Sequence, residues 1–147
     1  MEINNKKILI CNCEATMDID DEALSKACKL ESKCKIHNNL CGSELGVVLD
    51  QLKVGNKENK NLLIACTQQE EVFENLAEEN NLQPPGTFNI REYAGWSKES
   101  KKSVPKISAL INSSVNETKK TPSLTLNSLG RCFVYTNSTI SDLSKFR

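Results

Sequence analysis

The chain lacks an excess of charge of either sign, and it is poor in histidine. Its 147 residues include 19 basic and 19 acidic side chains, so the formal net charge is zero. Without a positive field, binding to nucleic acid or to an anionic membrane surface is not expected. The single histidine argues against a histidine-rich zinc site and leaves no visible nucleophile–base pair for hydrolysis. No autonomous catalytic site is therefore expected.

Long apolar runs are also missing. The longest is "LLIAC" at 62–66, five residues against the ~20 of a membrane span. The opening "MEINNKKILICNC" has a three-residue apolar run, too short for a signal peptide. We therefore expect no membrane span and a cytoplasmic protein, with one main domain plus an extension.

Cysteine, by contrast, is abundant, with seven residues. The reducing cytoplasm disfavours structural disulfides, so cysteines in such a chain indicate metal binding, redox chemistry or plain burial.

A β-type run, a cysteine and the polar start of an amphipathic helix follow one another three times in the first eighty residues. Strands are expected at 6–13, 34–41 and 59–66, each followed by a helix, at 20–30, 42–54 and 67–80. A fourth unit reads as a strand in "TFNIRE" and a helix in "KSVPKISALINSS". This alternation predicts an α/β fold: a parallel four-stranded sheet with flanking helices in a flavodoxin-like or Rossmann-like order.

The C-terminal part has a different composition. We expect the α/β domain at 1–114, a linker at 115–123 and the start of a second, truncated α/β unit at 124–147, which forms a short β-rich extension.

Four cysteines fall where the predicted strands end. Cys11 and Cys13 end the first strand, Cys41 the second and Cys66 the third. In a flavodoxin-like order these strands are neighbours, so their carboxyl ends meet at one edge of the sheet. Four thiolates suit zinc or an iron–sulfur cluster. The alternative is that these cysteines are small, well-buried core residues.

The helices that follow support a ligand role. Ser43 and Thr67 are expected to cap helices directly after Cys41 and Cys66, so that free N–H groups and the positive helix end face the sulfurs.

The other cysteines have less positional support. Cys28 lies on the apolar face of the first helix and is expected in the core. Cys34 starts a weak strand, although it could replace a ligand in another sheet arrangement, and Cys132 lies in the extension. A thiol–disulfide role for Cys11 and Cys13 is also open, but Cys-x-Cys lacks the two-residue spacer of thioredoxin-type motifs.

The segment "NIREYAGW" places Arg91 and Glu92 at the end of the fourth predicted strand, beside the cysteine edge. Arg91 could donate to a cluster sulfide. Alternatively it pairs with Glu92 and holds the loop, with Trp96 packed over the edge. His37 lies among polar residues and is expected at the surface.

Four segments together resemble a known family: "ILICNCEATMDI", "NLCGSELGVVLDQL", "NLLIACTQQEEVFENLAEE" and "FNIREYAGWS". Over about residues 6–114 the chain is similar to the N-terminal domain of the flavin-binding subunit of heterodisulfide reductase, and more closely to the N-terminal region of related bacterial iron–sulfur proteins described as 4Fe-4S ferredoxins. The resemblance implies that Cys11, Cys13, Cys41 and Cys66 ligate a [4Fe–4S] cluster in an electron-transfer module.

The sequence also departs from that family. No flavin-binding GxGxxG motif and no ferredoxin-type CxxCxxCxxxCP repeat follows residue 114. Redox protein partners, or ferredoxin-type domains that this sequence lacks, are therefore implied. We predict a metal-binding component of an oxidoreductase; the alternatives are a non-catalytic α/β interaction domain with buried structural cysteines, or a four-cysteine zinc site.

Overall fold

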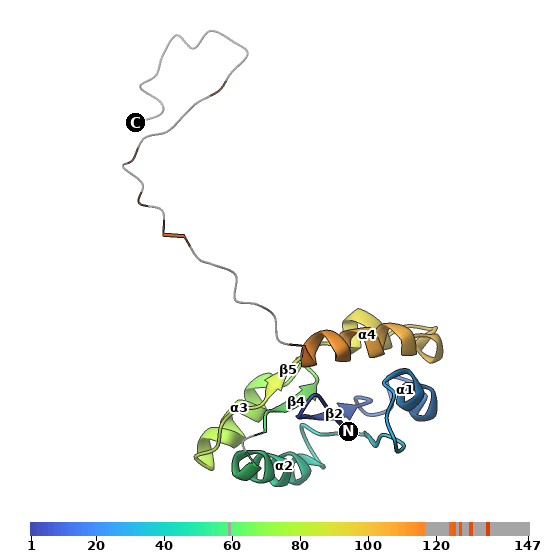
Figure 1. The fold of residues 1–147 in the computed structure, drawn as a ribbon, viewed down its shortest axis with the longest axis horizontal. Helices are drawn as coiled ribbons and strands as arrows, with labels where there is room; N and C mark the ends of the chain where they lie inside the picture. The colour runs from blue at the N-terminus through green and yellow to red at the C-terminus, as the bar shows by residue number, and fades with distance from the viewer. Residues whose placement is uncertain (59, 117–123, 126, 128–129, 131–134, 136–147) are drawn as a thin grey trace. The chain divides into compact units, whose positions relative to one another are not determined.

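The structure is a computed structural model that describes residues 1–58 and 60–116, together with positions 124, 125, 127, 130 and 135. Its contacts divide the chain into two units, Met1–Glu117 and Thr118–Arg147. The helices and strands named below all lie in the first unit (Figure 1). Apart from the single positions given above, the unit expected at 124–147 lies outside the described residues, as does most of the linker expected at 115–123.

In the described part of the chain, the centre of the fold is one open, mostly parallel sheet of five strands. These are β1 (Glu2–Ile3), β2 (Lys6–Cys11), β3 (Ile36–His37), β4 (Leu62–Ala65) and β5 (Gly86–Thr87). One edge of β2 pairs in parallel with β4, which in turn pairs in parallel with β5. The other edge pairs antiparallel with β1 near the start of β2 and in parallel with β3 near its end. Strand β2 therefore lies between β3 and β4, so the three strands expected to lead to the ligand cysteines are neighbours.

The α/β class is confirmed, but the sheet is not the purely parallel four-stranded sheet that we expected. The added strand is β1, which a two-residue turn at Asn4 and Asn5 joins to β2. Both asparagines have positive φ, 50° and 61°. A tight hairpin needs this backbone, and asparagine tolerates it better than most residues do. The Asn-Asn pair is thus the sequence signal for this hairpin.

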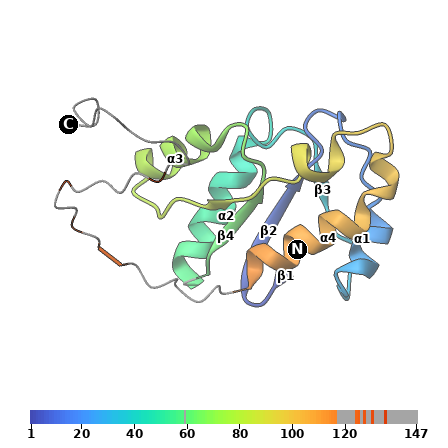
Figure 2. The same ribbon diagram turned by 90° about the horizontal axis from the view of Figure 1, so that it is seen from above.

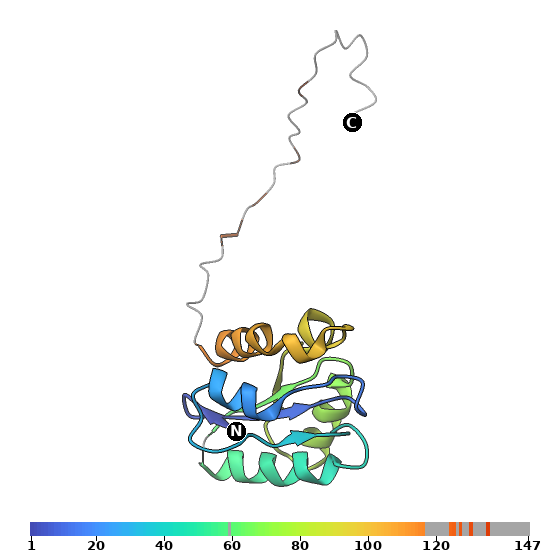
Figure 3. The ribbon, with the colours of Figure 1, turned by 90° about the vertical axis from the view of Figure 1, so that its right-hand side faces the viewer.

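Helices cover both faces of the sheet. They are α1 (Asp21–Ala27), α2 (Leu45–Glu58), α3 (Glu70–Glu79) and α4 (Val104–Val115). Ile8 and Ile10 of β2 pack in a core with α1 and α4, whereas Leu9 and Cys11 pack in a core with α2 and α3. This is the two-residue alternation of a strand buried on both faces. Figures 1 and 3 show α4 and α2 on opposite sides of β2, and the view from above in Figure 2 looks down onto α4. No described helix combines the length and apolar character needed to cross a membrane.

Two predicted strands are much shorter than expected. The second is reduced to β3, and the fourth to β5. Arg91 and Glu92 do not end a strand but begin a π-helical turn, η1 (Arg91–Gly95), followed by the short 3-10 turn η2 (Ser100–Lys102). Backbone N–H groups of Gly95 and Trp96 donate at 2.8 Å to carbonyls five residues earlier. Such π turns are frequent at functional sites.

Candidate functional site

The first two cysteines lie where the chain turns out of the sheet. Strand β2 ends at Cys11. Three consecutive residues beyond it have left-handed backbones: Cys13, Glu14 and Ala15, with φ of 54°, 55° and 61°. The Asn12 carbonyl closes the turn by accepting a hydrogen bond from the Met17 N–H at 3.1 Å. Each left-handed non-glycine residue costs about 1 kcal/mol or more. The chain leaves the strand at Asn12, and this departure lets both cysteines reach one site.

The third cysteine, Cys41, lies in a loop that the Glu44 carboxylate holds. Glu44 accepts backbone N–H bonds from Asn38 at 2.6 Å and Asn39 at 2.8 Å, and it lies 2.9 Å from His37 Nδ1. The Asn39 N–H, and after it the His37 ring, lower the pKa of Glu44 to about 2. His37 is 4% exposed, so its predicted surface position was wrong. It is buried because the ring has an ionised partner.

The turn of Cys13 and the loop of Cys41 are tied to each other. The Glu14 N–H donates to the Asn38 carbonyl at 2.7 Å, and the Asn39 side-chain oxygen lies 3.5 Å from Cys41 Sγ. The positions of these two cysteines are therefore linked by hydrogen bonds.

The fourth cysteine, Cys66, directly follows β4. Helix α3 begins only at Glu70, and its N-cap residue is Gln69, whose side chain makes no capping bond. Thr67 is thus not the N-cap that the sequence predicts. Helix α2 likewise begins at Leu45, so neither helix starts directly after its cysteine.

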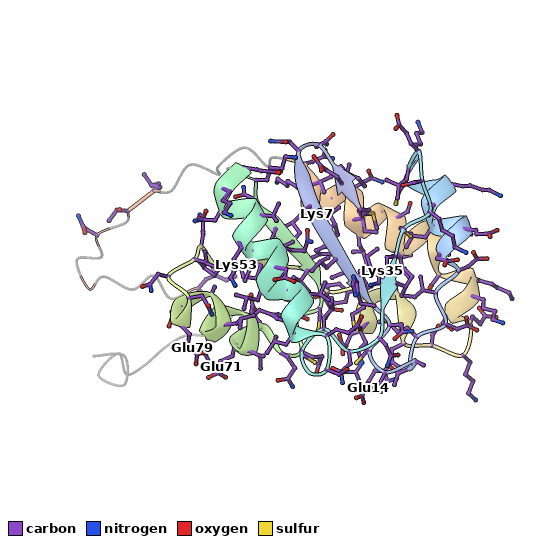
Figure 4. All side chains as sticks on the ribbon, turned by 90° about the horizontal axis from the view of Figure 1, so that it is seen from below. Lys7, Glu14, Lys35, Lys53, Glu71 and Glu79 are labelled. Carbon is purple, nitrogen blue, oxygen red and sulfur yellow. The ribbon has the colours of Figure 1, made fainter. Side chains whose placement is uncertain are left out.

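All four cysteines meet beyond the carboxyl ends of β2, β3 and β4. One cavity of about 350 Å³ has in its wall Cys11, Cys13, Cys41 and Cys66, together with Met17 and Arg91. Glu14 also lines it, and Figure 4 shows Glu14 at the opposite end of β2 from Lys7. The structure therefore brings the four predicted ligand residues to one site.

The remaining described cysteines lie elsewhere. Cys28 and Cys34 pack in the core beside α1 and α4, and neither lines this cavity. The Cys34 thiol donates to the Asp21 carbonyl at 3.4 Å. Burial, and then the nearby Cys34, raise the pKa of Cys28. Cys132 lies outside the described residues.

The thiols of Cys11 and Cys41 hold their protons more firmly than an ordinary cysteine does. Burial raises the pKa of both, and the proximity of Cys66 adds to each shift. Backbone N–H groups oppose the shift at Cys11, among them that of Cys13, 3.4 Å from Cys11 Sγ. Among the residues that the structure describes, no three Cys, His, Asp or Glu side chains are grouped closely enough to hold one metal ion.

Arg91 adds a positive charge to the wall. Its guanidinium lies 4.2 Å from the centre of the Trp96 ring, and its Nε lies 3.8 Å from Glu92 Oε1. The predicted Arg91–Glu92 pair is thus present, whereas Trp96 contacts Arg91 but is 59% exposed and does not line the cavity. Arg91 nevertheless also reaches the cysteine cavity.

Sequence reasoning missed Met17 and Gly95. Met17 is 3% exposed and lines the cavity, and a Cβ added at Gly95 would overlap Met17 Sδ. Gly95 therefore lets η1 lie directly against this wall. The sequence offers only an isolated glycine after a predicted strand, and a glycine can mark a close approach of the backbone to a neighbour.

Comparisons of the chain with protein-family models, curated proteins and solved structures found no match. The family resemblance noted in the sequence thus stays a prediction, and a function has to be argued from the site itself.

Proposed function

We propose that this chain binds a [4Fe–4S] cluster and transfers electrons as one module of a larger redox protein or complex. Its ligands are Cys11, Cys13, Cys41 and Cys66. The observation that supports this most is that all four, from three separate segments, line one cavity of about 350 Å³. Soft sulfur ligands select zinc or iron–sulfur clusters, and four thiolates complete either site.

The surroundings of the sulfurs fit a cluster. The Cys13 N–H points at Cys11 Sγ, and such bonds stabilise a thiolate and tune the reduction potential of a cluster. Met17 and Phe73 give the wall apolar surface that limits water access. When bound, a cluster supplies one-electron redox chemistry, while the residues of the chain hold it and shield it.

A four-cysteine zinc site is the nearest alternative. Zinc needs four sulfurs about 2.3 Å from one ion. The four cysteines line a cavity of about 350 Å³, which has room for more than a single ion. The size of the cavity favours the cluster, and metal analysis distinguishes the two.

A structural packing role explains only one of the four cavity cysteines. Cys11 is 4% exposed and belongs to the core beside α2 and α3, as a structural cysteine would. Cys13, Cys41 and Cys66 are only half-buried. A non-catalytic interaction domain would not require three further partly accessible thiols around the same cavity.

Anaerobic reconstitution with iron and sulfide tests the proposal. We expect about four irons and four sulfides per chain, as a [4Fe–4S] cluster requires, with visible absorbance that dithionite bleaches. Cys41→Ser and Cys66→Ser should each lower the iron content. Cys28→Ser is the matched control, because Cys28 is half-buried like Cys41 and Cys66 but does not line the cavity.

Three results would separate the candidates. Colourless, iron-free protein after reconstitution would contradict the cluster. One tightly bound zinc per chain that depends on Cys41 and Cys66 would establish the zinc site. A metal-free fold that tolerates Cys13→Ala and Cys66→Ala with losses of only ~1 kcal/mol would favour the interaction domain.

A further inference from the structure

Arg91 has a buried donor without an acceptor. Its Nε is buried, and among the described residues none offers it a hydrogen-bond acceptor. The nearest carboxylate oxygen, Glu92 Oε1, is 3.8 Å away, beyond hydrogen-bond distance. That oxygen already accepts a bond of 2.8 Å from Gln68 Nε2.

The other contacts of Arg91 do not supply an acceptor for its Nε–H. The Trp96 ring, 4.2 Å from the guanidinium, attracts the cation through its face but offers no acceptor for an N–H in the guanidinium plane. Arginine cannot lose its proton in a protein, so the charge and the donor both persist. Buried N–H groups without a partner are rare and destabilising, which indicates that an acceptor is supplied from elsewhere.

The cavity is where an acceptor can come from. Arg91 shares its wall with the four cysteines. An anionic, sulfur-rich group bound there brings acceptors and negative charge to the wall that Arg91 helps to form.

We propose that Arg91 is a binding residue of the cysteine cavity, whose guanidinium donates a hydrogen bond to a sulfur of the bound cluster and whose charge offsets that of the four thiolates. This inference rests on the proposed function. A fixed positive charge stabilises the reduced, more negative cluster more than the oxidised one, so Arg91 raises the reduction potential. The hydrogen bond also slows loss of the cluster.

A purely structural Arg91 behaves differently. If it only holds η1 through Trp96 and Glu92, its replacement weakens the fold of the empty and the loaded protein alike. The potential of the cluster then stays unchanged. The potential is therefore the measurement that distinguishes the two roles.

The test compares Arg91→Gln, Arg91→Lys and Lys98→Gln after anaerobic reconstitution. Lys98→Gln is the control, because Lys98 is exposed, lies near the same turn and is not part of the cavity wall. Redox titration gives the midpoint potential, a ferrous chelator gives the rate of cluster loss, and thermal unfolding of the empty proteins gives stability. Emission from Trp96, the single tryptophan, reports whether the turn keeps its structure.

We expect Arg91→Gln to have a more negative potential and roughly tenfold faster cluster loss, the effect of removing one hydrogen bond to a charged group. Arg91→Lys keeps the charge but lacks the planar guanidinium donors, so its potential stays near wild type while its cluster is lost faster. Lys98→Gln should match wild type.

Equal potentials and loss rates in wild type and Arg91→Gln would overturn the inference and leave the cluster itself in place. If Arg91→Gln does not fold, an unchanged loss rate in Arg91→Lys would overturn it. A wild-type chain that takes up no iron would instead overturn the proposed function, and this inference with it.

Discussion

The side-chain amide of Asn39 donates a 2.7 Å hydrogen bond to the carboxylate of Glu14, 25 positions earlier in the chain. This bond joins the loop that carries Cys41 to the left-handed turn that carries Cys13. Glu14 is exposed and Asn39 is half-buried, so the relative position of two candidate ligands depends on a polar contact near the surface.

Replacing Asn39 by Asp should separate these two segments. Two carboxylates would then face each other where a hydrogen bond now lies, and like charges at this distance repel. We expect Asn39→Asp to be about 1 kcal/mol less stable than wild type at pH 7. Asn39→Ala only removes the bond, so its free energy of unfolding in urea should lie between those of wild type and Asn39→Asp. Equal stability of the Asp and Ala variants would show that the Glu14 contact has no energetic effect.

Glu44 predicts an acid dependence of stability. Its pKa is about 2 in the folded chain against an ordinary value of 4.5. A carboxyl whose pKa falls on folding contributes stability that is complete above about pH 4.5 and is lost as the pH falls towards 2. Glu44→Gln should therefore be less stable than wild type at pH 7, with a difference that shrinks below pH 4.5.

Urea unfolding at several pH values measures that difference. Glu71→Gln, on the exposed surface of α3 (Figure 4), is the control and should change little at any pH. A Glu44→Gln difference that stays constant from pH 7 to pH 3 would mean that the Asn39 and His37 contacts do not stabilise the fold.

Gly95 and Met17 should be energetically coupled. Gly95→Ala forces a Cβ against Met17 Sδ and should cost about 1–3 kcal/mol, as overpacking does. Met17→Ala empties a buried site and should cost about 2–5 kcal/mol. The double variant should lose clearly less stability than the two single variants lose together, because the shortened side chain at position 17 makes room for the new methyl group.

A second glycine provides the control for this cycle. Gly46 lies in α2, and a Cβ there meets nothing within 4 Å. Gly46→Ala should therefore be neutral or stabilising by about 0.5–1 kcal/mol. Strict additivity of the Gly95 and Met17 changes would contradict the predicted overlap.

Alkylation of the thiols should change on cluster loading. Burial raises the pKa of Cys11 and Cys41, so in the empty protein both should react slowly with iodoacetamide at pH 7 and faster towards pH 9. Loading should protect the four cavity cysteines at both pH values. Mass spectrometry of the digested protein measures each site, and Cys28 should react equally in the two forms. Loss of Cys28 reactivity on loading would indicate a general tightening of the fold.

The alternation of strands and helices could be predicted because apolar periodicity is local. Buried runs such as "ILI" in β2 and "LLIA" in β4 specify strands by themselves. That Cys11, Cys41 and Cys66 lie at one edge then follows from the right-handed connections between parallel strands. The sequence could therefore predict that the four cysteines line one cavity.

Features that depend on distant partners could not be predicted in this way. His37 is predicted at the surface because its sequence neighbours are polar, and the local sequence does not show that the Glu44 carboxylate, seven positions later, contacts its ring. Arg91 looks like the end of a strand because π-helical turns have no period of their own in a sequence. Thr67 has the spacing of a cap, but α3 starts three residues later.

The left-handed run at Cys13, Glu14 and Ala15 also determines which substitutions this segment can accept. Valine, isoleucine and threonine are excluded at all three positions, because a branched Cβ is incompatible with positive φ. Glycine at 14 or 15 would relieve strain, and asparagine or aspartate would fit with little loss. Homologues that keep the Cys-x-Cys pair should therefore carry mainly glycine, asparagine or aspartate in the two positions after it, a pattern by which distant relatives could be recognised.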